Sequence, residues 1–161
     1  MTSRLSITEK IISISLVIWG GLTLFYTSRG LFNFMEVVTR KDLSLLTTFK
    51  NVHILLLLPI ATILAGALLF FDKKSGWTLS LIVLLLNGLM FLIPSNNHTH
   101  NFTSRHSDVV LALLVTAIAC LIFFFILVQK PFLAKYHPTN RTWLTVALIT
   151  IAIIFDRTLI F

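Results

Sequence analysis

Three histidines and one aspartate come closest, by residue type and spacing, to a chemical site. His98, His100 and His106 lie in a polar stretch that ends at Asp108. Imidazole nitrogens with a carboxylate oxygen form a donor set that suits zinc or copper. The spacing matches no specific metal motif, however, and a run rich in Asn, Ser and Thr is more simply a solvated connection that ends in a helix cap at Ser107 and Asp108. We therefore predict no bound metal or cofactor, with metal binding by these histidines as the alternative.

The sequence contains no other pattern typical of catalysis. His53 is the one histidine at an apolar segment, which disfavours a haem held by two histidines of the same chain. A His-Glu-x-x-His zinc motif, a Gly-x-Ser-x-Gly elbow and a Gly-rich phosphate loop are all absent. Cys120 stands alone in an apolar run, so it forms no intramolecular disulfide and is interpreted as a packing residue. We predict that the protein is not an enzyme.

The apolar segments carry no Asp, Glu, Lys, Arg or His in their central parts. Ionisable groups inside a membrane usually mark proton relays and ion pathways, so their absence argues against a proton-coupled or ion-coupled transporter. Asn87 is the deepest strongly polar side chain. A hydrogen bond to a neighbouring helix is a more common use for such a residue than contact with a ligand.

Composition indicates the kind of structure that carries these residues. The chain has 161 residues, of which 57% are hydrophobic and 12% charged, and its mean hydropathy is +0.93. A soluble domain is roughly a quarter charged and has too much surface to hide so many apolar side chains. The net charge of +7 comes from basic residues scattered through short connections. This pattern predicts an integral membrane protein in contact with lipid headgroups, not a nucleic-acid-binding protein.

Five segments approach the roughly 20 apolar residues that cross a bilayer. They are residues 10–28, 52–71, 77–93, 108–129 and 143–155. We predict an all-α, single transmembrane domain over residues 1–161, built as a bundle of about five helices. Ser6 and Glu9 have capping-box spacing before the first segment. Asp156 and Arg157 interrupt the apolar run of the last segment, residues 143–161. We nevertheless expect this segment to span the membrane.

Residues 30–51 are neither polar enough to form a typical loop nor apolar enough to cross the bilayer. Apolar residues recur there at helical spacing, with charged residues between them: Leu31, Phe34, Met35, Val38, Leu45 and Phe49, and Arg40, Lys41 and Asp42. The pattern predicts an interfacial amphipathic helix between the first and second spans. Alternatively, its second half extends the second span.

Small residues indicate where helices pack closely, because close contact replaces hydrophobic exclusion inside a bilayer. One predicted packing face contains Ala61, Thr62, Ala65 and Gly66, and a second contains Ala112, Thr116 and Cys120. Pro59 is expected to kink the second span. The pair Gly20 and Gly21 permits close approach or local bending of the first.

The distribution of basic residues gives a weak orientation signal. With five spans, seven Lys and Arg residues lie on the side of the N-terminus and six on the other side. The first set occupies shorter segments, which favours a cytoplasmic N-terminus in a bacterial inner membrane. Trp77 and Trp143 would then both lie at the inner interface, where indole rings are enriched.

These observations support one principal function and two alternatives. The principal prediction is a non-enzymatic subunit or accessory protein that contacts another membrane protein, or a second copy of itself. The first alternative is a small transporter or channel for a neutral or lipid-like substrate, with Pro59, Gly20, Gly21 and Asn87 as its moving and lining parts. The second alternative is a metal-dependent membrane enzyme that uses the histidine-rich loop.

Overall fold

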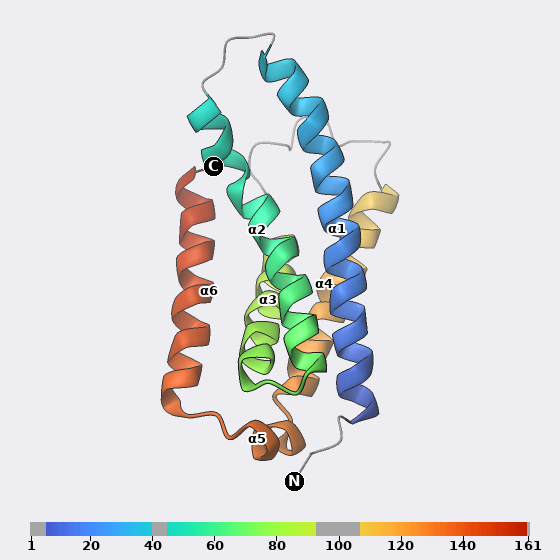
Figure 1. Cartoon of the computed structure of the whole chain (residues 1–161), viewed down its shortest axis with the longest axis vertical. Coiled ribbons are helices and arrows are strands. Elements are labelled where there is room, and N and C mark those ends of the chain that lie inside the picture. The colour runs from blue at the N-terminus through green and yellow to red at the C-terminus, as the bar shows by residue number, and fades with distance from the viewer. Residues whose placement is uncertain (1–5, 40–44, 93–106, 161) are drawn as a thin grey trace. The chain divides into compact units, whose positions relative to one another are not determined.

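The computed structural model describes residues 6–39, 45–92 and 107–160, and this part of the chain is helical and contains no strand. Its six helices are α1 (Ile7–Thr39), α2 (Leu45–Phe70), α3 (Lys74–Leu92), α4 (Ser107–Leu127), α5 (Lys130–Tyr136) and α6 (Asn140–Ile160) (Figure 1). Two compact units divide the chain, Met1–Gly76 and Trp77–Phe161. The first unit contains α1 and α2, and the second contains nearly all of α3 together with α4, α5 and α6.

Every predicted apolar segment is helical over its described residues, apart from Phe71, Val128 and Gln129, which follow the ends of α2 and α4, so the all-α prediction is confirmed. By length and composition, one described helix is a candidate membrane span, Ile7–Gly30. A second candidate arises if the residues Leu114–Leu127 and Lys130–Tyr136, which meet at 61°, count as one bent span. Leu56–Phe70 and Lys74–Leu89 are apolar but shorter.

The prediction of a separate interfacial helix between the first two spans is wrong. Residues 30–39 continue α1, and residues 45–49 begin α2. No proline interrupts residues 30–39, so the helical hydrogen bonds of α1 can continue through them. The alternative, that the second half of this segment extends the second helix, is confirmed.

A capping box forms the N-terminus of α1, as its sequence predicts. The Ser6 backbone N–H donates to Glu9 Oε2 at 2.8 Å, and the Glu9 backbone N–H donates to Ser6 Oγ at 3.2 Å. Each side chain thereby satisfies a backbone donor that the helix itself leaves without a partner. The Glu9 side chain is buried in this arrangement.

In the first unit, α1 and α2 run antiparallel and side by side (Figure 1). A Cβ atom on Gly20 of α1 would lie 2.9 Å from both the Ile63 nitrogen and the Pro59 carbonyl oxygen of α2. A Cβ atom on Gly66 of α2 would lie 2.7 Å from the Ser13 carbonyl oxygen of α1. Only glycine lacks a Cβ, so these two residues allow the two backbones to approach each other this closely.

The predicted packing face of α2 is buried. Thr62, Ala65 and Gly66 are buried and Ala61 is half-buried. The Thr62 hydroxyl donates to the Leu58 carbonyl of its own helix at 2.8 Å, so its burial leaves no hydroxyl unsatisfied. The small side chains of α2 therefore form the close contact that the sequence predicts there.

The end of α2 is fixed by a Schellman motif. The Asp72 backbone N–H donates to the Leu69 carbonyl at 2.9 Å, and the Lys73 N–H donates to the Leu68 carbonyl at 3.0 Å. Asp72 adopts a left-handed conformation, with φ of 57°. Aspartate is among the few residues other than glycine that tolerate this region, because its short side chain bonds locally. The turn places Lys73 directly after the last residues of α2.

In the second unit, an aromatic cluster forms around Trp77 of α3. Its indole N–H donates to the carbonyl of Leu127, the last residue of α4, at 3.1 Å. The ring stacks on Tyr136 of α5, with centroids 5.6 Å apart, and meets the edge of Trp143 of α6 at 5.9 Å. Trp77 is completely buried against these neighbours; its predicted depth at the inner membrane interface stays a prediction. Burial is favoured because both the ring faces and the N–H find partners within the protein.

Candidate functional site: an apolar groove between α1 and α2

The histidine-rich loop lies mostly outside the described residues. His98, His100 and His106 belong to the segment that the structure does not describe, so the metal alternative stays a prediction. Asp108 is the second residue of α4, which begins at Ser107, close to the predicted helix start. Among the residues that are described, no group of three or more His, Cys, Asp or Glu side chains can hold a metal ion.

The structure also describes three other residues that the sequence singled out, Asn87, His53 and Cys120. The Asn87 side-chain amide is buried in α3 and donates to the Val83 carbonyl of the same helix at 2.7 Å. This bond is intrahelical, whereas the sequence predicted a bridge to a neighbouring helix. Asn87 lies one turn after Val83, so its amide reaches that carbonyl without a second helix. His53 is half-buried in α2, and Cys120 is buried in α4, as expected for a packing residue.

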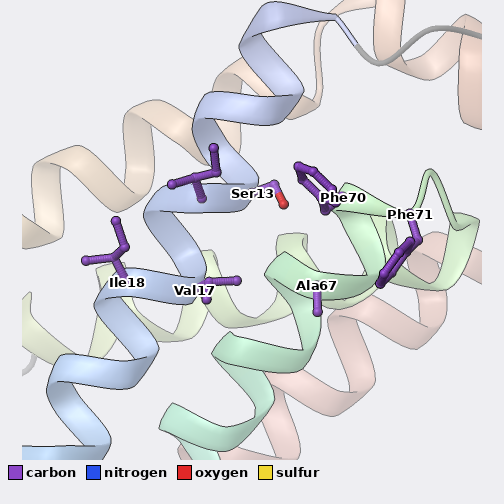
Figure 2. A pocket seen from close by; sticks show the side chains of 7 residues that line it. Ser13, Val17, Ile18, Ala67, Phe70 and Phe71 are labelled. Atoms are coloured by element: carbon purple, nitrogen blue, oxygen red, sulfur yellow. The ribbon is translucent and has the colours of Figure 1, made fainter.

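A groove with a volume of about 250 Å³ lies between α1 and α2 (Figure 2). One wall consists of Ser13, Ile14, Val17 and Ile18 of α1. The other wall consists of Ala67 and Phe70 of α2 and of Phe71, which follows the helix. Residues 13, 14, 17 and 18 share one face of a helix because their spacing follows its 3.6-residue period.

The walls of the groove present only apolar atoms. Ser13 is the one lining residue with a polar side chain, and its hydroxyl donates to the Gly66 carbonyl oxygen at 2.5 Å. The side chains around it are exposed, and Ile18 and Phe71 retain 57% and 67% of their accessible surface. The groove is therefore suited to an alkyl chain, and it offers no hydrogen bond to a polar ligand.

Exposed lysines lie at one end of the groove. Lys10 precedes Ser13 by three residues and Ile14 by four, so it continues the same face of α1. Because α1 and α2 are antiparallel, the start of α1 adjoins the end of α2, where Lys73 and Lys74 follow Phe71. All three lysines are exposed. The two acidic residues nearby are less accessible, since Glu9 is buried in the cap and Asp72 is half-buried in the turn.

Sequence reasoning did not identify this groove, although part of its signal was present. The sequence shows Lys10 in register with Ile14 and Val17 on one face of a helix. It also shows two consecutive phenylalanines followed by lysines at residues 70–74. Nothing in the spacing indicates that these two segments meet. Their meeting depends on the Gly20 and Gly66 contacts, which set the register of α1 against α2.

The second unit contains a short helix that the sequence did not predict. Phe132 and Tyr136 are four residues apart in α5 and are both buried, while Lys130 is exposed. The Lys135 ammonium lies 5.1 Å from the centre of the Tyr136 ring, within cation–π range. The available signal was the spacing of four residues between Phe132 and Tyr136, with Lys135 between them. This helix places the Tyr136 ring against Trp77 in the aromatic cluster of the second unit.

The chain matches no known protein-family model, no curated protein and no solved structure. Its function is therefore inferred from the chemistry of its own residues.

Proposed function

We propose that the chain is a membrane-embedded helical protein that acts without catalysis, by contacting a second membrane protein or a second copy of itself. The observation that carries this proposal is an exposed apolar stripe along α1. Six of its residues recur at intervals of three or four and are exposed: Ile7, Ile11, Ile14, Ile18, Leu22 and Phe25. A rise of about 1.5 Å per residue puts Ile7 and Phe25 about 27 Å apart along the axis, close to the hydrocarbon thickness of roughly 30 Å.

Two helices of the second unit carry similar stripes. On α4 the exposed residues are Leu111, Leu114, Val115, Ile118, Ile122 and Phe125, and on α6 they are Leu144, Leu148, Ile151 and Phe155. A helix on the surface of a soluble protein turns a polar face outward. Outward apolar stripes on three helices are favourable in contact with lipid tails or with another membrane protein. These stripes support the membrane placement. The proposal keeps about five spans, a bacterial inner membrane and a cytoplasmic N-terminus from the hydropathy and charge pattern of the sequence.

The transporter alternative receives no specific support from the described residues. Gly20 and Pro59, which were candidates for moving parts, meet each other in the packed contact between α1 and α2. Asn87, the candidate lining residue, donates its amide hydrogen bond within α3. Each of these residues thus has a structural use that requires no transported substrate.

Membrane fractionation followed by site-specific photo-crosslinking tests the proposal. We expect the full-length protein to resist extraction by alkaline carbonate and to require detergent. A photo-reactive residue at Ile11 or Leu22, both exposed on the α1 stripe, should then form one adduct of constant mass, whereas the same residue at the buried Leu16 should not. A soluble protein would contradict the membrane placement. A detergent-extracted protein without a protein adduct at any exposed stripe would contradict the accessory role.

A further inference from the structure

We propose that the groove between α1 and α2 binds an anionic phospholipid, with an acyl chain between the two helices and the phosphate near Lys10 and Lys73. The inference rests on the proposed membrane placement and adds a ligand class to it. The occupant is identified from three properties of the groove, namely its walls, its opening and the charge at one end.

The walls select an alkyl chain. They present only apolar atoms from α1 and α2, and the Ser13 hydroxyl is engaged by the Gly66 carbonyl. A polar ligand would lose its hydrogen bonds to water without replacement, which disfavours its binding. An acyl chain has no such bonds to lose and gains contacts with Ile14, Val17 and Phe70.

The opening of the groove favours a ligand that enters from the side. Ile18 and Phe71 on opposite walls are more than half exposed, so the groove is not an enclosed cavity. A lipid in the surrounding bilayer can slide one chain into such a groove and keep its second chain outside. The groove lies on α1, whose Ile7–Gly30 portion is the candidate membrane span.

The charge at one end favours an anionic headgroup. Lys10 lies one turn before Ile14 on the groove face of α1, and Lys73 follows Phe71 after the Asp72 turn. Both ammonium groups belong to exposed residues, whereas Glu9 is buried. Basic pockets beside membrane helices bind anionic headgroups, and each Lys near such a surface strengthens binding by about fivefold. Phosphatidylcholine, which has no net charge, lacks this gain.

Native mass spectrometry of the full-length protein in a mild detergent tests the charge component. Phosphatidylglycerol and phosphatidylcholine with identical acyl chains are titrated separately, and the affinity of the first bound lipid is compared. We expect a preference for phosphatidylglycerol of at least tenfold. The double variant Lys10→Gln with Lys73→Gln should reduce this preference to about twofold or less. The matched double variant Lys130→Gln with Arg141→Gln, in the second unit, should leave it unchanged.

A second pair of variants tests the groove itself. Ala67→Leu places a larger side chain in the groove and should weaken the binding of both lipids by at least fivefold. Ala152→Leu adds the same atoms to an exposed position of α6 and should change neither affinity. If Ala67→Leu lowers the melting temperature, Ile18→Gln is used instead, because Ile18 is exposed and its replacement puts an amide into the groove without overpacking.

The outcomes separate this inference from the proposed function. A membrane-embedded protein whose lysine variants keep the full phosphatidylglycerol preference would overturn the lipid site and leave the proposed function intact. The lipid site would also be overturned if Ala67→Leu leaves both affinities unchanged but dissociates a dimer, because the groove would then bind a second copy of the chain. A protein that alkaline carbonate releases from membranes would overturn both.

Discussion

The two units of the molecule hold their helices together by different physical means. In the Met1–Gly76 unit, the contact depends on residues without a side chain, since Gly20 and Gly66 allow α1 and α2 to meet backbone to backbone. In the Trp77–Phe161 unit, the ends of α4, α5 and α6 meet around one large side chain, Trp77, which stacks and donates a hydrogen bond. Lipid tails are as apolar as leucine, so neither unit can rely on hydrophobic exclusion if it lies in a bilayer.

The difference predicts opposite sensitivities to substitution. A contact between glycines and backbone is damaged when atoms are added, because the facing backbone cannot move away without shifting its whole helix. A contact built on a tryptophan is damaged when atoms are removed, because a cavity and an unpaired carbonyl remain. This contrast is tested through the free energy of unfolding, measured by SDS titration in detergent micelles and followed by circular dichroism.

The largest effect is expected from Trp77→Ala in the second unit. Removal of the indole leaves a cavity beside Tyr136 and Trp143 and takes away the donor to the Leu127 carbonyl. We expect a loss of about 3–5 kcal/mol. Trp77→Phe keeps a ring and should lose less than half as much. Equal losses for the two variants would show that the ring contacts do not hold this unit together.

A neighbouring pair of glycines tests the first unit. Gly20→Ala places a Cβ 2.9 Å from backbone atoms of Ile63 and Pro59 and should cost about 1–3 kcal/mol. Gly21→Ala is the matched control, because a Cβ there meets nothing within 4 Å. Alanine favours a helix over glycine, so Gly21→Ala should be neutral or slightly stabilising. If both variants have the same free energy of unfolding, the close approach of α1 and α2 does not determine the stability of the first unit.

Gly88→Ala in α3 refines the comparison with a glycine of the second unit. A Cβ at Gly88 would lie 2.8 Å from Leu121 Cδ2 and 2.9 Å from Leu121 Cγ, which move when this side chain changes rotamer, and 3.6 Å from the nearest backbone atom, the Ala117 carbonyl oxygen. We therefore expect a loss below about 1 kcal/mol, smaller than that of Gly20→Ala. A larger loss for Gly88→Ala would mean that the second unit also depends on backbone contact.

The smallest effect is expected from Ser13→Ala in α1. This change removes the hydrogen bond to the Gly66 carbonyl and leaves the glycine contact in place. Hydrogen bonds between membrane helices contribute about 0.6 kcal/mol on average, and we expect a loss of this size. Ser15→Ala, on another face of the same helix, is the control and should change the free energy less.

Local spacing in the sequence determined most of the secondary structure. The apolar segments predicted the helices, and Ser6 with Glu9 predicted the capping box that begins α1. The small residues Thr62, Ala65 and Gly66 correctly marked the packed face of α2. These features depend on residues within one or two helical turns of each other, so they can be recognised without knowing which helices meet.

The errors of the sequence prediction fall where distant segments or weak boundaries decide the result. The expected interfacial helix is divided between α1 and α2, because amphipathic spacing alone does not show where a helix ends. The burial of Trp77 among other helices was not predicted, because its partners Leu127 and Tyr136 lie 50 and 59 residues further along the chain. Until those partners are known, the position of Trp77 in the sequence is compatible with lipid contact as well as with burial.

Hydropathy and residue spacing were enough to predict a helical, unusually apolar chain with basic connections. They did not predict that Ile14 and Val17 of α1 line a groove together with Ala67 and Phe70 of α2, with lysines at one end. Hydropathy and helical period are properties of neighbouring residues, whereas the groove joins residues about fifty positions apart. A groove also depends on the register between two helices. Glycines that are far apart in the sequence fix this register, because they allow the two helices to approach closely.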